Sequence, residues 1–252
     1  MIPKTLHYCW FGGGQLSELE QKCIRSWEVV LADYKIIRWD ESNFPIKDFP
    51  YVSAAYDAKK WAFVSDYVRV WALYNYGGIY LDTDFQIIKP IDEFLGKNVF
   101  LGVENKEYVG AAIMGAEKGN WLLKSMLNYY DKNPFEITEG KYNMIPNTMV
   151  LTDLLVKMGY HRGESETIDG IYIAPKDMFY PTLQKEDYPD NTYGVHFFRG
   201  SWWSEKERKR ANSNAYKKII RPALICMKKL LGRIVGADTS RKIEMQIKNI
   251  LK

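Results

Sequence analysis

The residues best suited to chemistry in this sequence are two aspartates, Asp82 and Asp84, which lie one residue apart. They follow two glycines and a short apolar run in the segment 77–84, whose sequence is GGIYLDTD. Side chains at positions i and i+2 of a strand share a face, so both carboxylates should project together where this strand ends. Carboxylates this close repel each other unless a positive group lies between them, and a divalent cation shared with a substrate phosphate is such a group. An exposed acidic turn without an ion is the alternative.

A second pair of charged residues lies one helix upstream. The segment 53–76 contains neither Gly nor Pro and is predicted to form one long helix that ends at the glycine pair. Asp66 and Arg69 lie three residues apart on this helix and are therefore neighbours on its surface. An ion pair within the helix would explain them. Because the helix runs directly into the aspartate strand, a site shared with Asp82 and Asp84 is the other explanation.

The surrounding elements predict an α/β fold. A strand at 4–10, a helix at 16–31 and a strand at 34–39 form a βαβ unit, which implies a parallel sheet. The loop after the first strand of such a unit is where nucleotides usually bind. Its glycines, at 12–14, do not have the spacing of a dinucleotide fingerprint. The other expected elements are a continuation of the aspartate strand through 85–88, strands at 100–103, 109–114, 171–174 and 193–198, helices at 121–130 and 148–158, and an irregular segment at 131–146.

Charge divides the 252 residues into an acidic body and a basic tail, although the net charge is only +4. Residues 205–252 carry fourteen Lys and Arg but four Asp and Glu, whereas in residues 1–204 acidic side chains outnumber basic ones. The tail is predicted to form basic amphipathic helices, which favours contact with an anionic membrane surface. Packing of the tail on the body or on a second subunit is the alternative. No nucleic-acid-binding motif is recognisable, so we expect no nucleic acid as a partner.

Cysteine usage and hydropathy indicate the cellular compartment in which the protein is expected. The three cysteines form no pattern, which favours a reducing environment. The sequence begins without a recognisable secretory signal, and no apolar run approaches the roughly 18 residues that a membrane span needs. We therefore expect a cytoplasmic protein that is peripheral on the inner face of the plasma membrane.

Three segments, taken together, resemble one enzyme family. They are HYCWFGG at 7–13, AFVSDYVR at 62–69 and YGGIYLDTD at 76–84. As a set they are similar to the DXD-containing sugar transferases of glycosyltransferase family 32, and the resemblance covers residues 2–204. It implies a GT-A fold, which is a Rossmann-like α/β domain with a mainly parallel central sheet. Such a domain binds a UDP- or GDP-sugar together with Mn²⁺ or Mg²⁺. The expected organisation is a catalytic domain at 1–204 followed by the basic helical tail at 205–252.

The resemblance also implies roles for single residues. Asp82 and Asp84 would serve the metal and the sugar, with Asp84 as the principal metal ligand. Asp66 and Arg69 would hold the hydroxyls and the diphosphate of the donor. Related GT-A enzymes take a late histidine as a further metal ligand, which here is His196; a strand histidine satisfied in the core is the alternative. The early aromatic turn that lies beside the nucleobase in this family corresponds to Tyr8, Trp10 and Phe11. The late segment that closes over the diphosphate corresponds to Ser201 and Trp202.

These expectations combine into a function. We expect a metal-dependent, retaining glycosyltransferase that moves a hexose from a nucleotide sugar to a lipid-linked saccharide acceptor in bacterial surface polysaccharide synthesis. The sequence shows no convincing catalytic base, and none is required where the leaving phosphate accepts the proton of the acceptor. Asn147 and Thr148, with Ala111 and Ala112, are candidates for the acceptor side. The alternatives are a non-catalytic carbohydrate-binding module and a nucleotidyl- or phosphotransferase, although a Walker lysine motif is missing.

Overall fold

The computed structural model describes residues 1–182 and 188–198, and every structural statement below refers to these residues. Ser201, Trp202 and the tail at 205–252 lie outside them, so the roles predicted for these residues stay predictions. Within the described part, no helix combines the length and the apolar character needed to cross a membrane.

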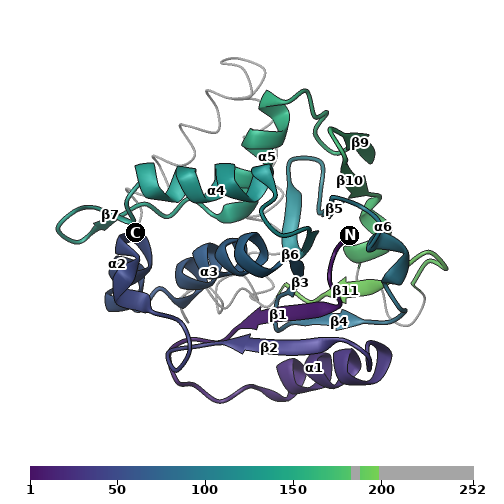
Figure 1. Cartoon of the computed structure of the whole chain (residues 1–252), viewed down its shortest axis with the longest axis horizontal. Helices are drawn as coiled ribbons and strands as arrows, with labels where there is room; N and C mark the ends of the chain where they lie inside the picture. Colours follow the sequence, from purple (N-terminus) through teal and green to yellow (C-terminus); the bar gives the residue numbers. More distant parts are fainter. Residues whose placement is uncertain (183–187, 199–252) are drawn as a thin grey trace, which may run out of the picture. The chain divides into compact units, whose positions relative to one another are not determined.

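A mixed sheet of seven strands forms the centre of the described residues, in the order β2-β1-β3-β6-β5-β10-β9 (Figure 1). Five strands point in the same direction, and β6 and β9 run against them. The expected α/β class and mainly parallel sheet are confirmed. The strands are β1 (Thr5–Cys9), β2 (Lys35–Trp39), β3 (Gly78–Leu81), β5 (Val99–Val103), β6 (Val109–Ala116), β9 (Glu166–Ile168) and β10 (Ile171–Ala174).

Helices cover both faces of this sheet and enclose two hydrophobic clusters. Figure 1 shows α3 and α4 on one side of β1 and β2 and α1 on the other. One cluster contains residues of α2 (Pro50–Asp57), α3 (Trp61–Tyr76), α4 (Trp121–Lys132) and α5 (Asn147–Lys157). The other contains residues of α1 (Glu18–Val30) and α6 (Lys176–Phe179). A capping box between Ser17 and Glu20 starts α1 close to the predicted position.

Shorter elements lie around the central sheet. β4 (Phe85–Ile87) pairs antiparallel with β11 (Gly194–His196) in a separate two-stranded sheet. β7 (Glu136–Thr138) and β8 (Lys141–Tyr142) form a hairpin, so the segment expected to be irregular contains a short regular element. Two single-turn helices, η1 (Ile46–Asp48) and η2 (Asp92–Phe94), complete the described elements.

The prediction of one helix over 53–76 was wrong, because the segment forms two helices. Lys59, between α2 and α3, has a φ of 55°, a backbone conformation that no helix accommodates. The residues between α2 and α3 include no Gly or Pro, so we attribute the break to packing of α3 against a distant part of the chain. The indole of Trp61, at the start of α3, lies so close to Gly12 that a Cβ on that glycine would come within 2.6 Å of the ring. The turn therefore directs α3 toward the loop that follows β1.

The prediction of one strand through 79–88 was also wrong. β3 ends at Leu81, a turn closed by the Phe85 N–H donating to the Asp82 carbonyl (2.9 Å) follows, and β4 joins the other sheet. Side chains of α1 fix this departure, because the Trp27 indole N–H donates to the Phe85 carbonyl at 2.7 Å and the Ser26 hydroxyl accepts from the Ile87 N–H at 3.0 Å. The two carboxylates therefore lie in a turn rather than along one strand.

The glycine pair allows the close approach that this path requires. Gly77 ends α3 with a φ of 68°, and its N–H donates to the Leu73 carbonyl. Gly78 has a φ of 111°, and a Cβ there would lie 2.4 Å from the Thr5 carbonyl oxygen on β1. Only glycine fits at this position, and it lets β3 enter the sheet directly after the helix.

Candidate metal and donor site

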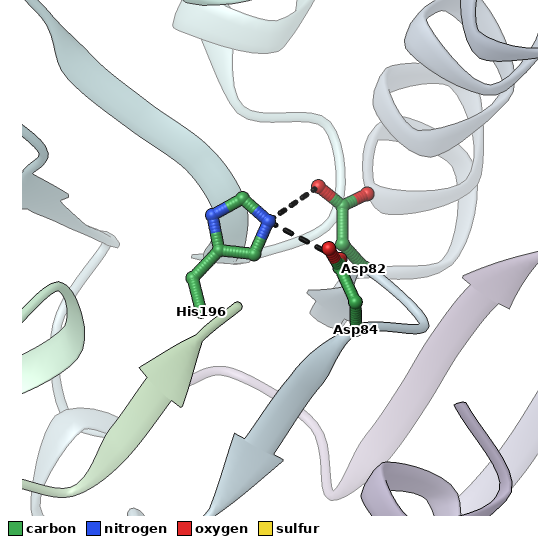
Figure 2. A group of neighbouring side chains, drawn as sticks. All are labelled: Asp82, Asp84 and His196. Atoms are coloured by element: carbon green, nitrogen blue, oxygen red, sulfur yellow. Dashed lines mark hydrogen bonds and ion pairs between the residues drawn. The ribbon is translucent and has the colours of Figure 1, made fainter. Parts of the chain in front are cut away.

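Asp82, Asp84 and His196 form one group at the edge of the central sheet (Figure 2). The His196 Nε2 lies 3.2 Å from Asp84 Oδ1 and 4.0 Å from Asp82 Oδ2. One ligand atom from each residue lies within 4.8 Å of the others. The β4–β11 pairing creates this arrangement, because it sets His196 opposite Phe85, the residue after Asp84. The three residues predicted as metal ligands are thus brought together.

The donor set fits a divalent cation. Two carboxylates and an imidazole supply hard oxygen ligands and one nitrogen around a single point. Burial lowers the pKa of His196, but the hydrogen bond and charge of Asp84, with the charges of Asp82 and Glu104, outweigh burial and raise the pKa above its ordinary value. The negative field that favours a proton on this imidazole would equally favour a cation between the three side chains.

The two oxygens of Asp82 have different surroundings. Oδ1 accepts a hydrogen bond from the Tyr80 hydroxyl at 3.0 Å and pairs with Arg69 Nη2 at 3.2 Å. Oδ2 is the oxygen nearest His196. Tyr80 and Arg69 therefore hold the carboxylate so that one oxygen faces the candidate metal position, which is how second-shell partners orient a ligand.

Arg69 connects the helix pair with the aspartate turn. Its Nη2 pairs with Asp66 Oδ1 at 3.1 Å as well as with Asp82, its Nη1 donates to the Ala111 carbonyl at 2.8 Å, and its Nε donates to the Ser65 carbonyl at 3.2 Å. The guanidinium also lies 4.5 Å from the centre of the Tyr80 ring. Both explanations of the Asp66–Arg69 pair therefore hold, because the intrahelical ion pair extends into the site.

Asp66 is the innermost carboxylate of this network. Burial raises its pKa to about 6, Arg69 opposes this shift and the charge of Asp82 adds to it. Its second oxygen accepts from the Asn147 backbone N–H, at the start of α5, at 3.3 Å. Asn147, predicted for the acceptor side, thus lies beside Asp66. Its buried side-chain Nδ2 has no hydrogen-bond partner within the described residues.

The aromatic turn after β1 divides into core residues and one partly exposed ring. Tyr8 is buried and packs edge-on against Trp27, with ring centroids 5.6 Å apart. Phe11 is buried against Phe44 at 6.3 Å. Trp10 is half-buried, and its indole N–H donates to the Gly14 carbonyl at 2.6 Å. Of the three residues predicted to lie beside a nucleobase, Trp10 is the one with surface available for stacking.

Two residues of this region, Tyr80 and Glu104, were not predicted from the sequence. Tyr80 lies two positions before Asp82 on the same strand, and that spacing could have identified it. Glu104 directly follows β5, a strand parallel to β3, at the sheet edge where ligands of α/β folds bind. Burial raises the pKa of Glu104, the positive charge of His196 lowers it, and the charge of Asp82 raises it further. The negative charge of Glu104 therefore contributes to the electrostatic field around His196 and Asp82.

Comparison with known proteins bears on this geometry. Residues 17–101 match the family described as glycosyltransferase sugar-binding region containing DXD motif. The matched region contains Asp66, Arg69, Tyr80 and both aspartates of the turn, and it ends before Glu104 and His196.

Proteins similar to this chain include glycosyltransferases. Inositol phosphoceramide mannosyltransferase 3 of Schizosaccharomyces pombe is 30% identical over 135 residues, which are 50% of this chain and 37% of that protein. Mannosyl phosphorylinositol ceramide synthase SUR1 of Saccharomyces cerevisiae is 27% identical over 142 residues, which are 52% of this chain and 36% of that protein. The chain thus spans little more than a third of the length of these relatives. A glycosyltransferase involved in the glycosylation of the major capsid of PBCV-1 is 12% identical with a TM-score of 0.49, covering 82% of this chain and 97% of the other.

Proposed function

We propose that the chain is a metal-dependent glycosyltransferase that moves a hexose from a nucleoside-diphosphate sugar to a saccharide acceptor with retention of anomeric configuration. The observation that carries this proposal is the convergence of Asp82, Asp84 and His196 on one point, directly beside the buried Asp66–Arg69 pair. A cation site next to groups that bind sugar hydroxyls suits transfer from a nucleotide sugar, because the cation neutralises the leaving diphosphate. The match of residues 17–101 to a glycosyltransferase sugar-binding region supports it.

The chain's own residues would divide the work between leaving group and sugar. Asp82, Asp84 and His196 would hold Mn²⁺ or Mg²⁺, which when bound supplies a Lewis acid for the leaving diphosphate. Asp66, whose carboxylate lies beside the Arg69 guanidinium, would accept hydrogen bonds from hydroxyls of the donor sugar. Trp10 would stack on the nucleobase. Ser201 and Trp202 are proposed to close over the diphosphate.

The relatives suggest a first choice of substrates. Two of them are named for mannose transfer and for inositol phosphoceramide, so mannose is the first hexose to test, with UDP- and GDP-sugars compared. We further propose a lipid-linked acceptor in bacterial surface polysaccharide synthesis. The basic tail at 205–252 would hold the cytoplasmic protein peripherally on the inner face of the plasma membrane.

Acceptor-free hydrolysis of the donor tests this proposal. Purified full-length protein is incubated with a panel of UDP- and GDP-sugars, and the released nucleoside diphosphate is measured. We expect slow release from one donor that needs Mn²⁺ or Mg²⁺, stops with EDTA and is lost in Asp84→Asn. Asp131→Asn, an exposed position on α4, is the matched control and should release at the wild-type rate.

The same assay separates the alternatives. A carbohydrate-binding module would bind sugars but release nothing from any donor. A nucleotidyltransferase would release nucleoside monophosphate or pyrophosphate instead of nucleoside diphosphate. Release that continues in EDTA or in Asp84→Asn would contradict the proposal.

A further inference from the structure

A carboxylate outside the matched region, that of Glu104, lies on the opposite face of the central sheet from Arg69. Glu104 follows β5, and it shares a face of that strand with Gly102, two residues earlier. That face is covered by the ring of Tyr180, which a Cβ on Gly102 would approach to 3.1 Å. The Tyr180 ring in turn lies edge-on to the His196 ring, with centroids 6.0 Å apart. Glu104 therefore lies on the His196 side of the sheet, whereas Asp66 and Arg69 reach the site from α3 on the other face.

Hydrogen bonds within its own turn hold Glu104 in place, and the imidazole of His196 is the cationic group that acts on its charge. Asn105 Nδ2 donates to its Oε1 at 3.0 Å, while Asn105 Oδ1 accepts from the backbone N–H groups of Glu107 and Tyr108. The backbone N–H of Glu104 donates to the Tyr108 carbonyl at 3.0 Å. No lysine or arginine among the described residues forms an ion pair with Glu104, and its second oxygen has no hydrogen-bond donor there. The turn thus presents one acceptor oxygen on a half-buried carboxylate whose other oxygen is held by Asn105.

An exposed aromatic ring, that of Phe198, packs against the rings of His196 and Tyr180. Phe198, two residues after His196, is 46% exposed, and its ring centroid lies 4.2 Å from that of His196 and 6.2 Å from that of Tyr180. Its φ of 50° is uncommon for a residue with a bulky side chain and carries a cost in backbone energy. The backbone thus holds the Phe198 ring partly exposed beside His196, although burial of an apolar ring in the core would be more favourable.

We propose that Glu104 and Phe198 form the acceptor subsite and that it takes a neutral polyol, the terminal sugar or cyclitol of the acceptor. A carboxylate that forms no ion pair with a lysine or arginine repels phosphate groups and accepts hydrogen bonds from hydroxyls. A flat exposed ring covers the apolar face of a sugar ring. Asp66 and Arg69 on one side of the metal position would hold the donor, and Glu104 and Phe198 on the other would hold the acceptor. This inference rests on the proposed glycosyltransferase function.

The test compares acceptor-free and acceptor-dependent release of nucleoside diphosphate from the donor found above. The probes are myo-inositol, methyl α-D-mannopyranoside and methyl β-D-galactopyranoside, with mannose 1-phosphate as the charged counterpart. We expect a neutral polyol to stimulate release and mannose 1-phosphate to stimulate much less. In Glu104→Gln the stimulated rate should fall about 10-fold or more, with the acceptor KM rising, as expected for loss of a charged hydrogen bond. In Phe198→Leu the stimulated rate should also fall and the acceptor KM rise, because the flat ring that covers the sugar is lost. The acceptor-free rate, measured at saturating Mn²⁺ because Glu104 contributes to the negative field around His196, should fall by a clearly smaller factor than the stimulated rate.

The controls separate this inference from the proposed function and from folding. Glu139→Gln, at an exposed position next to the β7–β8 hairpin, should change neither rate. Equal loss of acceptor-free and stimulated release in Glu104→Gln would place Glu104 in the donor site and overturn the acceptor role. Stimulation by mannose 1-phosphate alone, or by none of the four probes, would overturn the neutral-polyol class while acceptor-free release still supports the transferase. Absence of any donor hydrolysis would instead overturn the proposed function itself.

Discussion

Replacing Tyr80 by Phe removes one hydroxyl and leaves the ring, its burial and its contact with the Arg69 guanidinium unchanged. The hydroxyl donates to Asp82 Oδ1, the oxygen that also pairs with Arg69. Without it, the Asp82 carboxylate keeps one of its two holding partners. The carboxylate then rotates more freely, and its other oxygen faces the metal position for a smaller fraction of the time.

The structure sets the expected size of this effect. A hydrogen bond to a charged acceptor contributes about 1.5–3 kcal/mol to stability, and the lower end applies here because Arg69 still pairs with Oδ1. We therefore expect the free energy of unfolding of Tyr80→Phe to fall by about 1.5 kcal/mol. Loss of a second-shell partner weakens metal binding by about 10–100-fold, and with one partner left we expect about 10-fold weaker Mn²⁺ binding.

Two measurements check these values. Urea unfolding gives the change in stability, and the electron paramagnetic resonance signal of free Mn²⁺, titrated in the presence of the nucleoside diphosphate, gives the affinity. Tyr130→Phe is the control, because the buried Tyr130 hydroxyl has no hydrogen-bond partner within the described residues; its removal should change stability and affinity little. Unchanged Mn²⁺ affinity in Tyr80→Phe, together with the expected loss of stability, would refute the positioning role.

Two further predictions concern the scaffold. Burial lowers the pKa of His7, the Gly77 carbonyl bonded to Nε2 opposes this shift, and the charge of Lys35 adds to it. Below about pH 6.5 the unfolded chain therefore binds a proton on His7 that the native protein does not bind, and the free energy of unfolding falls as the pH is lowered. This fall should be smaller in His7→Gln, and urea unfolding at pH 7 and pH 5 measures it. At Gly78, whose Cβ would meet the Thr5 carbonyl oxygen, Ala should cost about 3 kcal/mol or more of unfolding free energy. Gly13→Ala, at a positive φ in open space, should cost about 1 kcal/mol in the same thermal or urea unfolding measurement, and equal costs at both positions would contradict the steric argument.

Local sequence patterns predicted most helices and strands, because the apolar periodicity within each element and the residues at its ends are visible in its own sequence. The βαβ unit formed by β1, α1 and β2 was predicted close to its observed bounds. The break at Lys59 was missed because it depends on the packing of Trp61 against Gly12, residues far apart in the sequence. The departure of β4 from the central sheet was missed for the same reason, since side chains of α1 bind its backbone.

In the candidate site, too, local sequence predicted some features, while others depend on contacts between residues far apart in the sequence. Asp82 and Asp84 were predicted to lie together from their spacing, and they do so, although in a turn instead of on one strand. His196 joins them through the β4–β11 pairing, which no local pattern of the sequence reveals. The predicted nucleobase contacts were only partly informative, because aromatic type alone does not distinguish Tyr8 and Phe11, which are in the core, from the partly exposed Trp10.

The central claim is that one divalent cation is bound jointly by Asp82, Asp84 and His196. Electron spin echo envelope modulation of Mn²⁺ bound to the full-length protein with the nucleoside diphosphate tests it directly, because an imidazole ligand adds a nitrogen coupling to the signal. We predict an imidazole nitrogen coupling in the wild-type protein that disappears in His196→Ala, together with loss of tight Mn²⁺ binding in Asp84→Asn. Tight Mn²⁺ binding without that coupling, or binding unaffected by Asp84→Asn, would contradict the account.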